Sequence, residues 1–149
     1  MAIWQYDLLF IGGGDARPLL TDDGWDIPPL SAASTLRAQQ ALVGSMGYPW
    51  LMMDDWVVFG SEQGTRIDLN FNGSNEVEIL IRVDALATEP ELDAVCAFAS
   101  ELGGRLFDPR TGAFLQPDRC SVASALATSR AAAFACSPRS FLSGLETNS

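Results

Sequence analysis

The amino-acid sequence predicts an α+β fold, a single domain in which helices pack on one face of an antiparallel β-meander. Three successive segments between residues 56 and 84 alternate apolar with polar side chains, as strands with one buried face do. On both sides of this region, apolar residues recur instead at helical spacing. The 149 residues contain no internal repeat and no linker long enough to divide them, so residues 1–149 are expected to form one domain.

The first part of the chain predicts a strand, a long connection and a helix. Residues 3–11 are rich in aromatic and branched side chains and lead into three glycines, which is typical of a strand. Residues 15–30 contain three prolines and are expected to be an irregular connection. From Ser31 the apolar spacing predicts a helix that ends at Gly44 or Gly47.

The meander itself is predicted after a short apolar segment at residues 50–53. Its strands are expected over 56–60, 65–72 and 76–84, and the two loops between them have the glycine, serine and asparagine content of hairpin loops. In the middle strand, apolar residues at odd positions alternate with polar residues at even positions. One face of the sheet is therefore expected to be buried and the other solvated.

A helix and a small hairpin are predicted next. Thr88, with Glu91 three residues later, forms the pattern of a capping box, and the helix that it opens is expected to end at Gly103. Residues 105–107 and 113–115 flank a turn with Asp first, Pro second and Gly last, which are favoured positions for these residues in a turn.

The C-terminal part, about 118–145, is rich in Ala and Ser and is expected to be helical. Asp118 is placed to cap a helix that continues to about Phe134. Pro138 should break that helix, and a short helical piece is expected around 139–145.

Charge and composition exclude many enzyme mechanisms. The chain has 19 acidic residues, nine basic residues that are all arginine, no histidine and a formal net charge of −10. It therefore lacks an imidazole base, a Schiff-base lysine and a P-loop lysine. The excess of acid lies in the first 109 residues and opposes binding to nucleic acid or to an anionic membrane. We expect a protein without enzymatic activity, cofactor or metal, and a basic protein as its partner.

The cysteines and the N-terminus favour a cytoplasmic location. Cys96, Cys120 and Cys136 are widely spaced and form no CxxC motif, so a reducing compartment is expected. Cys96 and Cys136 are expected to be small buried residues within helices. The N-terminal apolar run is interrupted by Asp7 and has no preceding basic residue, unlike a signal peptide.

A family resemblance adds a specific function. Residues 65–84 (TRIDLNFNGSNEVEILIRVD) and 91–115 (ELDAVCAFASELGGRLFDPRTGAFL) resemble small bacterial immunity proteins of polymorphic toxin and type VI secretion effector–immunity pairs. The shared features are an acidic and apolar alternation, a helix and the Leu-Phe-Asp-Pro-x-Thr-Gly hairpin, within about residues 56–116. The resemblance implies a cytoplasmic, non-enzymatic protein that binds and neutralises a cognate toxin. It does not extend to the Ala/Ser-rich C-terminal part.

The candidate toxin-binding residues are mostly carboxylates, because a toxin with a basic active cleft would be attracted and occluded by an acidic surface. Trp25 and Trp56 lie among them and could be either interface anchors or covers over the core. The candidates are Asp22, Asp23, Trp25, Asp26, Asp54, Asp55, Trp56, Asp68, Asn70, Glu76 and Glu78.

Two other interpretations stay open at the level of sequence. One is a small metal-assisted hydrolase that uses Asp22, Asp23, Asp54 and Asp55, because paired carboxylates can hold divalent metal ions. The other is a structural or adaptor subunit, such as a homodimer, in which the Ala/Ser-rich C-terminal helices associate with one another.

Overall fold

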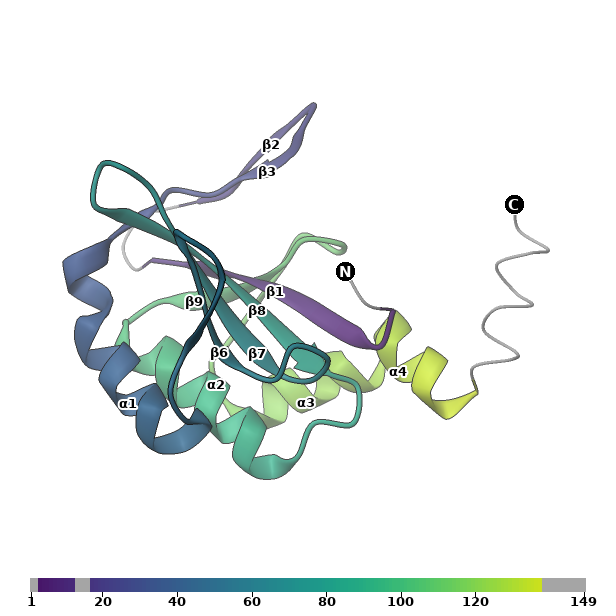
Figure 1. Ribbon diagram of the computed structural model, residues 1–149. Helices are drawn as coiled ribbons and strands as arrows, with labels where there is room; N and C mark the ends of the chain where they lie inside the picture. Colours follow the sequence, from purple (N-terminus) through teal and green to yellow (C-terminus); the bar gives the residue numbers. More distant parts are fainter. Residues whose placement is uncertain (1–2, 13–16, 138–149) are drawn as a thin grey trace.

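The computed structural model describes residues 3–12 and 17–137, and it shows an α+β domain with helices on one face of an antiparallel sheet (Figure 1). The strands and helices are β1 (Gln5–Ile11), β2 (Leu19–Thr21), β3 (Gly24–Asp26), β4 (Leu30–Ser31), α1 (Leu36–Met46), β5 (Trp50–Met53), β6 (Trp56–Gly60), β7 (Arg66–Phe71), β8 (Glu76–Asp84), α2 (Glu89–Glu101), β9 (Arg105–Asp108), β10 (Ala113–Leu115), α3 (Arg119–Ala127) and α4 (Arg130–Cys136).

The main sheet extends the predicted meander in both directions. Its order is β10-β9-β1-β8-β7-β6-β5, with β4 also paired to β8, and every pairing is antiparallel. The meander β6-β7-β8 is confirmed, with Ile67 opposite Ile81 and Asn70 opposite Glu78. The N-terminal strand lies between β8 and β9, so the strands of the sheet's centre are far apart in the sequence.

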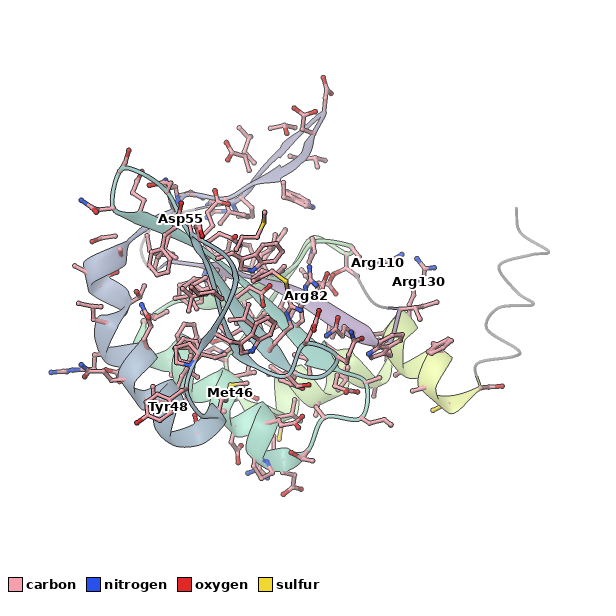
Figure 2. The ribbon with its side chains drawn as sticks, viewed as in Figure 1. Met46, Tyr48, Asp55, Arg82, Arg110 and Arg130 are labelled. Atoms are coloured by element: carbon pink, nitrogen blue, oxygen red, sulfur yellow. The ribbon has the colours of Figure 1, made fainter. Side chains whose placement is uncertain are left out.

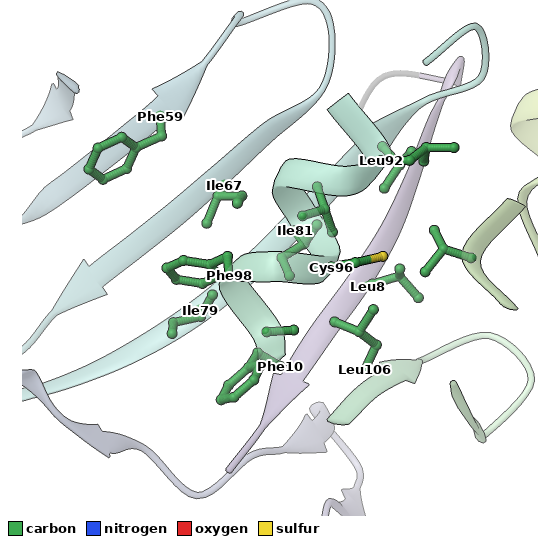
Figure 3. Close-up of a cluster of buried hydrophobic side chains, with 14 of the residues drawn as sticks. Leu8, Phe10, Phe59, Ile67, Ile79, Ile81, Leu92, Cys96, Phe98 and Leu106 are labelled. Atoms are coloured by element: carbon green, nitrogen blue, oxygen red, sulfur yellow. The ribbon is translucent and has the colours of Figure 1, made fainter. Parts of the chain in front are cut away.

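The hydrophobic core lies between the sheet and the helices. Side chains on the helix-facing side of the strands, such as Leu8 and Ile81, are fully buried. They pack in one cluster with α2 residues such as Phe98 and Cys96 (Figure 3). Burial of side chains of this size is worth about 1.5–3 kcal/mol each, which explains why the apolar alternation fixes the strand register.

The helix ends mostly follow their sequence signals. Thr88 and Glu91 form the expected capping box of α2, and Gly47, with a φ of 85°, ends α1. The first turn after Ser31 is a 3-10 helix, Ala32–Thr35, and α1 begins only at Leu36.

Two segments differ from the sequence prediction. The connection over 15–30 contains the hairpin β2–β3, which projects from the domain as an arm (Figure 1). The single helix expected from Asp118 to Phe134 is two helices, because the hydroxyl of Ser129 accepts the N–H of Ala132 and caps a new start. The helical piece expected around 139–145 lies outside the described residues.

The cysteine prediction is half correct. Cys96 is buried, and burial raises the pKa of its thiol to about 11. Cys136 lies in a helix as expected but is exposed, as is Cys120. Among the helices formed by the described residues, none has the length and apolarity needed to cross a membrane.

Candidate functional site

A row of four charged side chains crosses the outer face of the sheet, the face turned away from the helices. Asp7 on β1 lies opposite Arg82 on β8, and Arg82 lies opposite Arg66 on β7. Asp68, two residues beyond Arg66, completes the row. Two arginines that face one another across strands would repel, and here each has its own carboxylate.

The pair Arg66–Asp68 is buried. The side chains are 3% and 0% exposed, and two hydrogen bonds of 2.8 and 2.6 Å join the guanidinium to the carboxylate. The indole N–H of Trp56 donates a third hydrogen bond to Asp68, at 2.9 Å. The hydrogen bond to Asp68 raises the pKa of Arg66. The expectation of a solvated face, with Asp68 available to a partner, is therefore wrong at this position.

Tryptophan rings explain this burial. Trp50 lies 5.8 Å from the guanidinium of Arg66 and donates to the carbonyl of Gly60, at 2.8 Å. A third ring, Trp25 on β3 of the arm, covers a different place: it packs edge-on against Phe107 of β9 with ring centroids 4.8 Å apart and donates to the carbonyl of Pro109 in the β9–β10 turn. The indole N–H groups of Trp25 and Trp56 are both bonded within the chain, which favours a covering role over the role of a free anchor.

Four of the other candidate carboxylates lie at one end of the sheet, where the β5–β6 turn meets the start of β8. Strand β4, which follows the arm, pairs with Glu76 and Val77, and the carbonyl of Asp55 accepts the N–H of Phe71 at the adjacent strand end. Asn70 lies opposite Glu78 in the same region. The arm, which carries the exposed Asp22, Asp23 and Asp26, is instead bonded through Trp25 to Pro109 in the β9–β10 turn. We call the region of Asp54, Asp55, Glu76 and Glu78 the acidic end; Figure 2 labels Asp55. Its residues are exposed, as is Asn70, except for the half-buried Glu76.

Exposed apolar side chains accompany these carboxylates. In the described part of the chain, β5 is the last strand on its side of the sheet. Leu51 and Met53 on this strand are 64% and 66% exposed, and Asp54 and Asp55 follow directly. Leu19 and Leu20 on the arm are also exposed. A sheet edge with exposed apolar side chains is a surface that other chains can pair with.

A cavity of about 730 Å³ lies away from these strand ends, between β1, the β9–β10 turn and the helices α3 and α4. Within its wall, the hydroxyl of Tyr6 donates to the buried carboxylate of Asp108 at 2.6 Å, and Asp108 also accepts the main-chain N–H of Arg110. Burial, together with the bond to Asp108, raises the pKa of Tyr6. The volume is in the range of small-molecule pockets.

Asp7 lines this cavity and lacks a hydrogen bond. Its side chain is 9% exposed, and neither of its oxygens receives a hydrogen bond from any described residue. The nearest charge is Nε of Arg82, 3.7 Å from Oδ1, and this nitrogen has no hydrogen-bond acceptor in the described part of the protein either. Burial raises the pKa of Asp7, and the attraction of Arg82 only partly opposes it.

Asp7→Asn is expected to stabilise the protein at pH 7. Because the folded-state pKa of Asp7 is raised, the native protein holds a proton that the unfolded chain releases, and stability falls as pH rises from about the ordinary value of 3.8 through the folded-state pKa. The neutral amide avoids that loss. Urea unfolding at several pH values should show a higher free energy of unfolding for Asp7→Asn than for the parent. This difference should be largest near neutrality and should disappear near pH 3.8.

Asp23→Asn, on the exposed arm, is the matched control, because it makes the same chemical change at a side chain that water surrounds. An Asp7→Asn variant that is less stable than the parent at pH 7 would contradict this account of the buried carboxylate.

Neither the metal interpretation nor the family resemblance receives independent support. Within residues 3–12 and 17–137, no group of three or more Asp, Glu or Cys side chains is arranged to hold a metal ion. Comparison with known families, with characterised proteins and with solved structures found no match to this chain.

Proposed function

We propose that this protein is a non-enzymatic immunity protein, which binds and neutralises a cognate antibacterial toxin through its acidic end. The observation that carries the proposal is the meeting of the β5–β6 turn with the start of β8, which brings the four carboxylates of Asp54, Asp55, Glu76 and Glu78 to one end of the sheet. A concentrated negative field of this kind accelerates association with a basic protein and selects against acidic ones.

Apolar contacts at the same end would hold the complex after the charges have brought it together. Leu51 and Met53 on the edge strand β5 are 64% and 66% exposed. The edge strand can pair with an extended segment of the partner, while its side chains supply an apolar centre surrounded by carboxylates. The resemblance of residues 56–116 to immunity proteins points in the same direction.

The test is co-expression with the product of the neighbouring reading frame. If the proposal is correct, that product inhibits growth when expressed alone, and the present protein restores growth and co-purifies with it. Restored growth without a complex would instead indicate enzymatic antagonism, and a harmless neighbour would refute the pairing.

Reversing charge at the acidic end should weaken the complex more than reversing charge elsewhere. The double variant Asp54→Lys/Asp55→Lys is expected to slow association by about tenfold or more at low salt, because rim charges act mainly on the association rate. Stopped-flow or biosensor kinetics at several salt concentrations would measure this, and the rate of the variant should depend less on salt than that of the parent.

The control is Glu62→Lys/Glu101→Lys, which makes the same change in net charge at exposed positions outside the acidic end. Equal slowing by the two double variants would show that only total charge matters, and the acidic end would lose its assigned role.

A further inference from the structure

The cavity beside β1 has features that the binding of a toxin at the acidic end does not require. It combines one nearly buried carboxylate without a hydrogen bond, Asp7, with two arginines, Arg110 and Arg130. Figure 2 shows these arginines at the same end of the molecule, by the β9–β10 turn and the start of α4. The charges are therefore separated: the acid lies inside and Arg110 is exposed at the surface.

The surface of the cavity is largely apolar apart from these charges. Ala113, Leu115, Ala125 and Ala131 line it, and hydroxyls from Thr128 and others are interspersed among them. Such a surface suits a short hydrocarbon segment, whereas Asp7 and Arg110 suit groups of opposite charge.

We propose that this cavity binds a small amphoteric molecule of the amino-acid class, with its ammonium group at Asp7 and its carboxylate at Arg110. An ammonium group supplies the hydrogen-bond donors that Asp7 lacks, and guanidinium groups bind carboxylates in a favourable planar geometry. The carbon chain of the ligand lies along the apolar surface. An entirely anionic ligand would be repelled by the carboxylate of Asp7. An entirely cationic ligand would form no ion pair with Arg110.

Three six-carbon probes separate these contributions: aminocaproate with both charges, hexylamine with the positive charge alone, and hexanoate with the negative charge alone. Glycine and γ-aminobutyrate are shorter amphoteric probes. Isothermal titration calorimetry on the full chain should show binding of at least one amphoteric probe at millimolar or lower concentration. The singly charged probes should bind about tenfold or more weakly, the cost of one charge-assisted hydrogen bond.

Two variants test the assigned ends. Asp7→Asn and Arg110→Gln should each lower the affinity for the amphoteric probe about tenfold or more. Of the two variants, only Arg110→Gln should bind hexylamine as the parent does. Arg110 is exposed, so its variant remains informative even if Asp7→Asn changes folding. Asp23→Asn, on the arm, should bind like the parent. Absence of binding by every amphoteric probe, or equal binding of all three six-carbon probes, would overturn the proposal.

Discussion

Asp68→Ala should lower the free energy of unfolding by about 3–5 kcal/mol, the cost of leaving one partner of a buried ion pair without its counter-charge. Asp68 is fully buried, and its carboxylate accepts two hydrogen bonds from Arg66 and one from Trp56. Without it, the guanidinium of Arg66 stays inside the protein with a single hydrogen bond, which it donates to the carbonyl of Glu62 at 3.2 Å. Urea unfolding followed by tryptophan fluorescence would measure the loss.

The chain offers a closely matched control in Asp93→Ala. Arg119 and Asp93 form the same two-bond geometry, at 2.8 and 2.6 Å, but their side chains are about half exposed. Water replaces the lost partner there, so little change in stability is expected. Similar losses in both variants would contradict the role that we assign to burial. The apolar replacement Arg66→Met/Asp68→Leu should cost less than Asp68→Ala, because it leaves no unpaired charge.

Gly104→Ala should destabilise the protein by about 3 kcal/mol, at the upper end of the usual cost of overpacking. A Cβ atom at this position would overlap the ring of Phe10 and the main-chain carbonyl of Ile11. Phe10 is fully buried in the core, so neither group can move aside without disturbing β1. The midpoint of chemical or thermal unfolding would report the effect.

Gly44→Ala is the control for this second prediction, and the expected change has the opposite sign. Gly44 is an exposed position in α1 with no atom within 4 Å of an added Cβ. Alanine should therefore stabilise the helix by about 0.5–1 kcal/mol. A Gly104→Ala variant as stable as the parent would mean that β1 and the end of α2 approach less closely than in the structure.

Local patterns were sufficient to predict the meander. The strands β6, β7 and β8 were predicted to within a residue or so because alternation and hairpin-loop residues are encoded within each segment. The capping box of α2 was found for the same reason. The arm was missed because the prolines around it favoured an irregular connection, although the residues at 21–24 are of turn-forming types. In the structure, the hydroxyl of Thr21 donates to the carbonyl of Gly24 and closes this turn.

The burial of Asp68 and the formation of the cavity depend on tertiary packing, which the sequence pattern does not encode. The alternation correctly predicted that Asp68 lies on the outer face of the sheet. It could not predict that this part of the face is buried, because the burial depends on Trp56 on β6 and Trp50 on β5. The cavity likewise depends on long-range pairing, because Tyr6 and Asp108 are 102 residues apart. A sequence pattern of short range contains no information about such a contact.

The two proposals make separate demands on the molecule. Capture of a toxin uses exposed carboxylates and an open sheet edge, and it predicts sensitivity to salt. The cavity uses a buried carboxylate that the fold holds at a cost to stability, a feature often associated with functional sites. Either can fail without the other, because their key residues lie on different elements: β5, the β5–β6 turn and β8 for the toxin, and β1, the β9–β10 turn and α4 for the cavity.

Hydrogen–deuterium exchange on the purified complex tests the central claim most directly. With the product of the neighbouring reading frame bound, protection should appear in β5 and the following turn at 50–55 and at the start of β8 at 76–78. The exposed surfaces of α1 and α2 should exchange as in the free protein. Protection confined to these helices, with the acidic end unchanged, would contradict the account.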